Sequence, residues 1–293
     1  MNLGTTLEAA VRGAVVGTGY GLLAMALVLT FRSTRVLNLA LGGIASVAAF
    51  VVWDLWADGS VPLGAAVAVA LVVSVALSLA GHVALRPVDR SPVAVKAVFS
   101  LGLLLALQGG IDAVWGPADR FLPLMVKGSV GTGDLRVGRQ QLLTAALTLA
   151  ALGVLTVWTR TRSLGLASLA IAEDEHAARA LGVRPAVVGA VVTAVAGLLA
   201  GAAGILLSGI GVVNATEMTL ALVTALAAAL LAGFEHLGIA VAAAAGVGAV
   251  TAAAASLPAV AEVPGLVESL GFIAVVVVVF ARPGAVASAL ERA

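Results

Sequence analysis

The sequence predicts an all-α, polytopic integral membrane protein, and three observations lead to this fold class. Mean hydropathy is +1.15, and 61% of the residues are hydrophobic while only 11% are charged. Long apolar runs such as "GFIAVVVVVF" recur along the chain and are separated by short polar breaks. Because the hydrocarbon layer of a bilayer is about 30 Å thick, a helical crossing needs roughly 20 apolar residues, and these runs supply them.

The apolar segments define nine candidate crossings in one transmembrane domain that spans residues 1–293. They lie at 13–30, 36–56, 62–85, 93–115, 140–158, 186–209, 218–234, 237–257 and 266–281. Segment 218–234 is short, and segment 36–56 opens with Asn38 and contains Gly42 and Gly43, so either could be a broken or re-entrant helix. The amide and the two glycines would permit unwound backbone beside a cavity. We therefore expect eight or nine transmembrane helices.

Lys and Arg residues fall unevenly on the alternating joints between these segments. One set of joints holds eleven cations: Arg32, Arg35, Arg86, Arg90, Lys96, Arg160, Arg162, Arg179, Arg184, Arg282 and Arg292. The other set holds five, which are Arg12, Arg120, Lys127, Arg136 and Arg139. Cytoplasmic loops retain more Lys and Arg, so we expect an outside N-terminus and a cytoplasmic C-terminus in the cell (inner or plasma) membrane. The first segment lacks the basic N-terminal region that is typical of a signal peptide. We therefore expect it to be a transmembrane helix that is not cleaved off.

The joint at 116–139, "GPADRFLPLMVKGSVGTGDLRVGR", is then an extracytoplasmic loop, and its turn signals predict a small hairpin. Its "GTG" is a poor phosphate cradle, and neither a G-x-x-x-x-G-K-[ST] motif nor a dinucleotide fingerprint occurs in the chain. We therefore expect a protein that is not an enzyme and does not hydrolyse ATP by itself. A net charge of +1 provides no basic surface for nucleic acid, and the absence of Cys excludes disulfides and Cys-based sites.

The joint at 163–184, "SLGLASLAIAEDEHAARALGVR", gathers charges that are rare elsewhere, and the orientation above makes it cytoplasmic. Ser163 can cap a helix, Gly182 supplies a C-terminal stop, and Pro185 prevents continuation, so we expect one or two short helices. Small and apolar residues recur at helical spacing, while the charges lie on the other sides. Small residues allow another surface to come close, and carboxylates around them can select a partner by charge.

Two simpler interpretations of this joint remain open. The charges could solvate a cytoplasmic loop, with Glu175 and Arg179 forming an i,i+4 pair. Glu173 and His176 share a helix face and could bind a metal, but a single pair provides too few ligands, so no metal is expected.

The same joint resembles the coupling loop of ABC importer permeases, in the form found in the branched-chain amino acid permease family. The matching residues are Gly165, Ala167, Ala170, Glu173, Asp174, Ala178, Leu181 and Gly182. Further stretches resemble that family in order: "GTGYGLLAMALVL" and "VLNLALGG" its first two helices, "LRPV" at 85–88 the motif after the third, and "FARPGAVA" its terminal exit. Together they span most of the chain.

The resemblance implies the membrane subunit of an ATP-driven importer. Its partners would be a second permease subunit, homologous or identical, two cytoplasmic ATPase subunits and an extracytoplasmic substrate-binding protein. The chain itself would need no cofactor, because the partner subunits bind ATP. Residues 163–184 would act as a lever, with Glu173 and Asp174 orienting the ATPase while Ala178 and Leu181 enter its groove. The implied substrate is a branched-chain or other apolar amino acid, with urea, short amides and small carboxylates as further options.

Polar or small groups inside the apolar segments are candidates for the substrate path: Thr18, Asn38, Gly42, Gly43, Gln108 and Asn214. The alternative for the polar ones is an ordinary hydrogen bond between helices. The alternative function is an ATP-independent secondary transporter or exporter of small metabolites. That class usually needs an ionisable residue at mid-membrane, and the segment centres contain no convincing one. An integral-membrane enzyme is a third option.

Overall fold

The computed structural model describes residues 3–88, 91–131 and 136–257, together with a few positions between 260 and 277. Its described part contains ten α-helices: α1 (Leu3–Thr34), α2 (Ala40–Val52), α3 (Leu63–Leu85), α4 (Val93–Trp115), α5 (Arg139–Thr161), α6 (Ser163–Glu173), α7 (Glu175–Ala180), α8 (Pro185–Ser208), α9 (Ala215–Leu231) and α10 (Leu237–Ala255). A π-helical turn (Trp53–Asp58) extends α2, and a 3-10 turn (Arg86–Val88) follows α3. A two-stranded antiparallel hairpin joins β1 (Ser129–Val130) to β2 (Val137–Gly138). The predicted all-α class is confirmed, and so is the small hairpin.

Seven helices of the described part are long and apolar enough to cross a membrane. They cover Thr6–Thr34, Ala40–Asp58, Leu63–Val88, Val93–Trp115, Arg139–Thr161, Pro185–Ser208 and Leu237–Ala255. Helix α9 is apolar but has only 17 residues, as expected for the short segment 218–234. The candidate crossing 266–281 falls largely outside the described residues. The chain is therefore a polytopic membrane protein.

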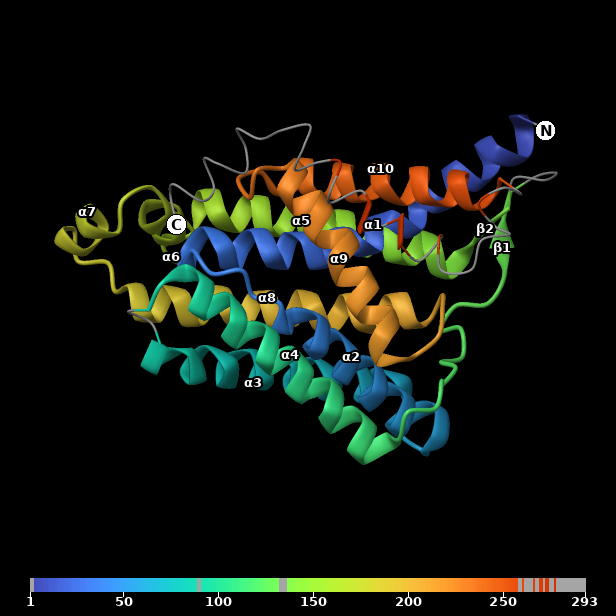
Figure 1. Ribbon diagram of the computed structural model, residues 1–293, viewed down its shortest axis with the longest axis horizontal. Helices are drawn as coiled ribbons and strands as arrows, with labels where there is room; N and C mark the ends of the chain where they lie inside the picture. Colours follow the sequence, from blue (N-terminus) through green and yellow to red (C-terminus); the bar gives the residue numbers. More distant parts are fainter. Residues whose placement is uncertain are drawn as a thin grey trace.

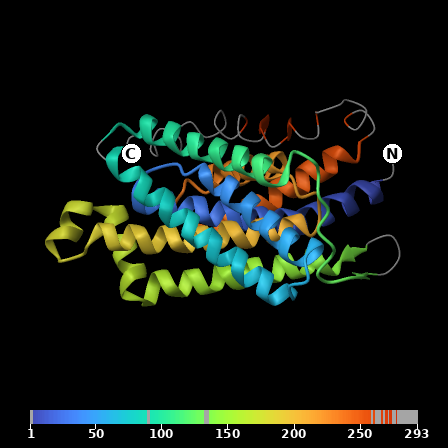
Figure 2. The same ribbon diagram turned by 90° about the horizontal axis from the view of Figure 1, so that it is seen from below.

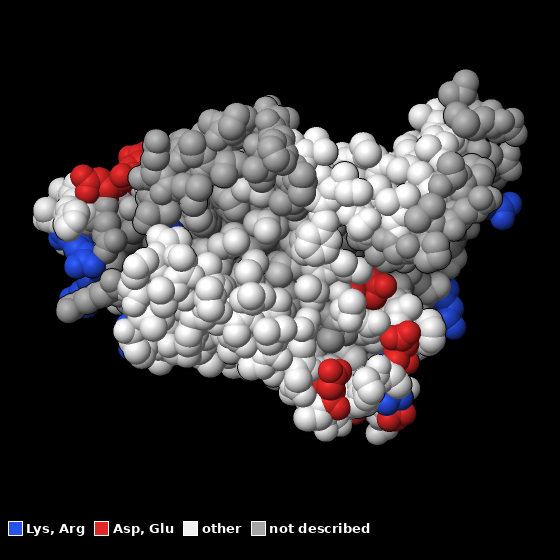
Figure 3. Space-filling model, viewed as in Figure 1, with Lys and Arg blue, Asp and Glu red and all other residues white. Residues whose placement is uncertain are grey.

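The helices of the bundle, with the short α9 included, alternate in direction along the chain, so the joints gather at two ends of the molecule (Figure 1). The α7 end holds the joints at 35–39, 86–88, 162–184 and 232–236. The hairpin end holds the start of α1 and the joints at 59–62, 116–138 and 209–214. On the visible face, charged atoms lie toward these two ends and a band of uncharged residues separates them (Figure 3). This arrangement matches two aqueous surfaces with hydrocarbon between them.

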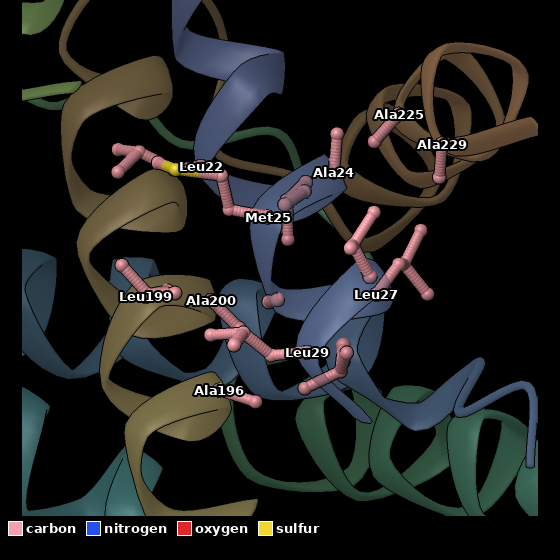
Figure 4. Close-up of a cluster of buried hydrophobic side chains, with 14 of the residues drawn as sticks. Leu22, Ala24, Met25, Leu27, Leu29, Ala196, Leu199, Ala200, Ala225 and Ala229 are labelled. Atoms are coloured by element: carbon pink, nitrogen blue, oxygen red, sulfur yellow. The ribbon is translucent and has the colours of Figure 1, made fainter. Parts of the chain in front are cut away.

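Helix α1 lies at the centre of the bundle. About three quarters of its apolar window, 72%, is buried, against 17% for α4 at the periphery. Leu22, Met25 and Leu29 of α1 pack against Ala196, Leu199 and Ala200 of α8, and Ala225 and Ala229 of α9 lie near the other side of α1 (Figure 4). These side chains form part of the main apolar core. The peripheral helices α3, α4 and α5 present apolar side chains outward, as lipid contact requires.

Helices α1 and α10 approach closely along a seam of small residues. A Cβ added to Gly17 would lie 2.6 Å from the carbonyl oxygen of Ala244, and one added to Gly248 would lie 2.5 Å from that of Gly13. Small residues spaced four apart allow such backbone contact in membranes, where no hydrophobic force drives helices together. The seam therefore requires glycine at these positions.

The 116–138 loop is held down at the hairpin end. Arg120 and Val213 exchange two backbone hydrogen bonds, at 3.1 and 2.8 Å. The Arg120 guanidinium lies 4.7 Å from the ring centroid of Trp53 and donates to the carbonyl of Trp115 at 3.0 Å. The loop thus connects the ends of α4, of the π-helical turn and of α8.

Candidate functional site

Residues 163–184 form the two short helices α6 and α7, and α7 projects beyond the other helices at its end of the molecule in both views (Figures 1 and 2). Asp174 separates the two helices with an extended backbone (φ −150°, ψ 106°). Its Oδ1 accepts hydrogen bonds from the backbone N–H groups of His176 at 2.8 Å and Ala177 at 3.0 Å. An N-cap aspartate satisfies donors that the first helical turn leaves unpaired. Asp174 therefore ends α6 and caps the start of α7.

Gly182 ends α7 with a left-handed backbone, φ +85°. Its N–H donates to the Arg179 carbonyl at 3.0 Å, and the Val183 N–H donates to the Ala178 carbonyl at 3.1 Å. This pair of bonds is a Schellman motif, which favours glycine because a Cβ strains the left-handed conformation. Pro185 then occupies the first turn of α8. The predicted stop and restart of the helices are confirmed.

The α6–α7 segment is attached firmly to the bundle. Ile171 and Ala178 are buried in the main core, with exposed fractions of 7% and 2%. A Cβ on Gly165 would lie 2.1 Å from the Trp158 carbonyl oxygen, so glycine permits α6 to pack against the end of α5. Arg35 donates from its guanidinium to the carbonyl of Ala172, near the C-terminal end of α6. Displacement of this segment would therefore be felt by α1 and α5.

One predicted contact residue lies on the wrong side of α7. The buried side chain of Ala178 faces the core and cannot enter a groove of another protein. Helix α7 has only six residues, and the face that carries Ala178 packs against the bundle. Leu181 is 83% exposed, and Glu173, Asp174, His176 and Arg179 are exposed as well. Ala167 and Ala170 are half-buried.

Three of the predicted path residues meet where α2, α4 and α9 pack together. A Cβ on Gly42 would lie 3.0 Å from Leu222, and one on Gly43 would lie 3.0 Å from Leu107. Gln108 donates from Nε2 to Thr219 Oγ1 at 2.5 Å, which is a hydrogen bond between α4 and α9. The expected unwinding at the two glycines is wrong: both are helical, and the break lies earlier, at residues 35–39.

The other three path candidates lie elsewhere. Thr18 donates to the Val15 carbonyl of its own helix at 2.6 Å. Asn214 caps α9 by accepting from the N–H groups of Thr216 and Glu217, and its Nδ2 donates to Asp119 at 2.8 Å. Asn38 lines a cavity at the α7 end. The six residues do not line one common cavity among the described residues.

Sequence reasoning missed a cavity of about 540 Å³ between α1, α9 and α10, which is lined in part by Arg12, Tyr20 and Glu217. Thr224 and Thr251 add hydroxyls, and the remaining walls are small and apolar side chains. A neighbouring cavity of about 100 Å³ shares Tyr20 and Glu217. Two signals were available in the sequence: Tyr20 is the only tyrosine, and Glu217 lies next to an apolar segment.

The described cations divide between the two ends as the alternating joints predicted. Eight lie at the α7 end: Arg32, Arg35, Arg86, Lys96, Arg160, Arg162, Arg179 and Arg184. Five lie at the hairpin end: Arg12, Arg120, Lys127, Arg136 and Arg139. The other three of the eleven cations that the sequence assigns to the α7 end, Arg90, Arg282 and Arg292, fall outside the described residues.

A family model described as "Branched-chain amino acid transport system / permease component" matches residues 9–279. The match covers most of α1 and every later described helix, and it includes the cavity between α1, α9 and α10 and the α6–α7 segment. No curated protein and no solved structure matches the chain.

Proposed function

The chain belongs to the family of permease components of branched-chain amino acid transport systems, and from this membership we propose that it is the membrane subunit of an ATP-driven ABC importer. The family match over residues 9–279 carries the proposal, because it spans the whole bundle and not a single motif. The importer would contain a second permease subunit, two ATPase subunits and an extracytoplasmic binding protein. ATP would bind to the ATPase subunits.

We assign the α6–α7 segment to ATPase docking. It projects from the bundle, carries an exposed Leu181 among charged residues, and is tied to α1 through Arg35 and to the core through Ile171 and Ala178. Charges at a rim set recognition and register, while a central apolar residue provides contact area. Closure of the ATPases would then push a rigid attachment, and the attached helices would switch access from one side to the other.

The positive-inside pattern supports a cytoplasmic location for the α7 end, with its eight described cations against five at the hairpin end. This orientation brings the docking segment to the side where ATPase subunits reside. It also exposes the hairpin end to a substrate-binding protein.

The cavity between α1, α9 and α10 is our candidate for the substrate path. An amino acid carries a carboxylate and an ammonium group, and the cavity offers Arg12 and Glu217 with small apolar walls. Most pockets that bind small molecules combine apolar walls with a few polar groups in this way. The pairing of opposite charges favours an apolar amino acid over urea, short amides or small carboxylates.

Reconstitution in liposomes tests the assignment. The permease pair, the ATPase subunits and the binding protein of one transport system should together hydrolyse ATP faster when leucine is present, and they should accumulate leucine. The chain without ATPase subunits should not transport. ATP-independent uptake by the isolated chain would instead support a secondary transporter.

A substitution at Glu217 tests the path. Glu217→Gln keeps the size of the side chain but removes its charge. We expect leucine uptake in the full complex to fall by about tenfold, which corresponds to the free energy of one hydrogen bond to a charged group. The matched control is Asp112→Asn, an exposed carboxylate on α4 that does not line this cavity. Equal uptake by the two variants would remove Glu217 from the path.

A further inference from the structure

The joint between α8 and α9, residues 209–214, forms a wall of the smaller cavity at the hairpin end. Ile210 and Val212 of this joint line that cavity, whose volume is about 100 Å³. Tyr20 and Glu217 line it too, and both also line the larger cavity between α1, α9 and α10. A shift of the joint would therefore change the space around two side chains of the candidate substrate path.

Two successive residues of the 116–138 loop hold this joint, where the two segments meet at the hairpin end (Figure 1). Arg120 and Val213 exchange backbone hydrogen bonds at 3.1 and 2.8 Å. The neighbouring residue Asn214 donates from Nδ2 to Asp119 at 2.8 Å. We call these four residues the outer latch. Its contacts are hydrogen bonds between two connecting segments, and such contacts can open without unfolding the helices on either side.

The buried polar atoms around the outer latch are incompletely paired. In the described part of the chain, three buried side-chain atoms make no hydrogen bond to another protein group: Arg120 Nε, Gln140 Nε2 and Ser208 Oγ. All three adjoin the α8–α9 joint. Ser208 precedes it, Arg120 pairs with Val213, and a Cβ added to Gly209 would lie 2.8 Å from Gln140 Nε2. Water can satisfy such groups when a segment moves away, so opening of the joint would relieve a cost that the closed arrangement carries.

Buried hydroxyls deeper in the described bundle are paired. Thr144 and Thr148 of α5 donate to carbonyls of their own helix at 3.0 and 2.9 Å. Ser78 of α3 donates to the Thr193 carbonyl of α8 at 2.8 Å. The unpaired atoms are therefore concentrated at the α8–α9 joint and are not a general property of the described interior.

We propose that the outer latch is a gate: during transport it opens, the α8–α9 joint moves away from the 116–138 loop, and the space around Tyr20 and Glu217 widens toward the extracytoplasmic side. This gating role rests on the proposed function, because it takes the cavity lined by these two side chains as part of the substrate path. Access must alternate between the two sides of the membrane, so an importer needs a reversible closure at its outer face. Breakable contacts beside unpaired buried groups provide such a closure.

A reversible cross-link tests whether the latch must open. Residues that exchange both hydrogen bonds of an antiparallel pair have Cα atoms about 5.5 Å apart, which a disulfide can span. The chain has no native cysteine. In the complete transport complex, we expect Arg120→Cys combined with Val213→Cys to lose leucine uptake on oxidation, in proportion to the cross-linked fraction measured by mass spectrometry. Reduction of the same sample should restore the uptake.

The matched control is a cross-link at the same end that leaves the joint free. Val130→Cys combined with Val137→Cys joins the paired strands β1 and β2, and uptake should be equal in its oxidised and reduced states. Normal uptake by a fully cross-linked Arg120/Val213 variant would overturn the proposal. An equal loss in the hairpin control would also overturn it, because the block would then not be specific to the latch.

Hydrogen exchange of the purified chain tests the latch without any transport. The amides of Arg120 and Val213 should exchange at one common rate, and faster than amides in the middle of α8, because both are released when the latch opens. Asp119→Ala should speed both, whereas Asp119→Asn keeps an acceptor for Asn214 and should match the wild type. Protection of both amides equal to that of α8, or no effect of Asp119→Ala, would exclude a latch that opens.

The two experiments separate failure of the gate from failure of the proposed function. If the wild-type complex does not transport leucine, the importer assignment fails, and hydrogen exchange still decides whether the latch opens. If the wild-type complex transports leucine and the cross-linked latch does so equally well, the importer assignment stands and the gate is excluded.

Discussion

Gly182 shows how much of the α6–α7 segment depends on single backbone conformations. Its φ of +85° lets α7 end in a Schellman motif, and no atom lies within 4 Å of the position that a Cβ would take. Any effect of a larger residue there must come from backbone strain, because there is room for the side chain. Asp174 acts differently, since its side chain both caps α7 and carries an exposed charge.

We expect Gly182→Val to destabilise the end of α7 by about 1 kcal/mol or more, since valine resists a left-handed backbone. The protein should still insert and fold, but ATP hydrolysis in the reconstituted complex should lose its stimulation by substrate. Gly153→Val is the control, because Gly153 lies in α5 with open space around it. Wild-type stimulation in the Gly182 variant would show that the exit angle of α7 does not matter.

Two substitutions separate the cap of Asp174 from its charge. Asp174→Asn keeps an N-cap acceptor and should leave the hydrogen-exchange protection of α7 unchanged, whereas Asp174→Ala should lose about 1 kcal/mol of local stability. If the charge orients the ATPase, the Asn variant should retain less ATPase than the wild type at low salt, and the difference should shrink as salt is added. ATPase retention equal to wild type in Asp174→Asn would limit Asp174 to its structural role.

At the scale of elements, the α1–α10 seam and the α6–α7 segment both depend on small residues for close packing. In the seam, glycine allows two membrane helices to touch along their backbones. In α7, Ala178 is small because it must fit under the helix against the core. We therefore expect Ala178→Trp to detach α7 from the bundle rather than to block a partner's groove.

The seam predicts a contrast between two glycines of α10. Gly248→Leu should lower the free energy of unfolding by about 1–3 kcal/mol, because its side chain would meet the backbone of α1. Gly246→Leu should have little effect, since nothing lies within 4 Å of its Cβ position. Thermal unfolding in detergent would measure both. Similar melting temperatures for the two variants would argue against a close α1–α10 contact.

At the scale of the whole molecule, charge and hydropathy divide the chain into two aqueous ends and an apolar middle. The alternation of the helices brings eight described cations to the α7 end and five to the hairpin end. The direction of the asymmetry predicts the orientation in the membrane, and with it the side of the membrane on which the α6–α7 segment lies.

Single cysteines test that orientation, and the absence of native cysteine means that no background must be removed. Both Ala177 of α7 and Ser129 of the hairpin are exposed. In intact cells, a membrane-impermeant thiol reagent should label Ser129→Cys and should label Ala177→Cys only after the membrane is opened. Labelling of Ala177→Cys from outside would reverse the topology and exclude cytoplasmic docking of α7.

Local chemistry explains how much the sequence determined by itself. Hydropathy sets which segments enter the bilayer, so the helices and the alternation of joints could be predicted without any knowledge of packing. The C-terminal end of α7 was also readable, because Gly182 and the proline after it act within a few residues of each other. The cap at Asp174, which separates α6 from α7, was not predicted.

Only the tertiary structure decided what depends on contacts between distant residues. Gly42 packs against Leu222, and the side chain of Gln108 donates a hydrogen bond to Thr219. The sequence around Gly42 and Gln108 could not distinguish these roles from that of a path residue. Ala178 faces inward because the bundle lies beneath α7. The cavity at the α7 end is lined by residues as far apart in the sequence as Arg32 and Arg179. Hydropathy and capping are local properties of the chain, whereas a binding cavity is a property of how its helices meet.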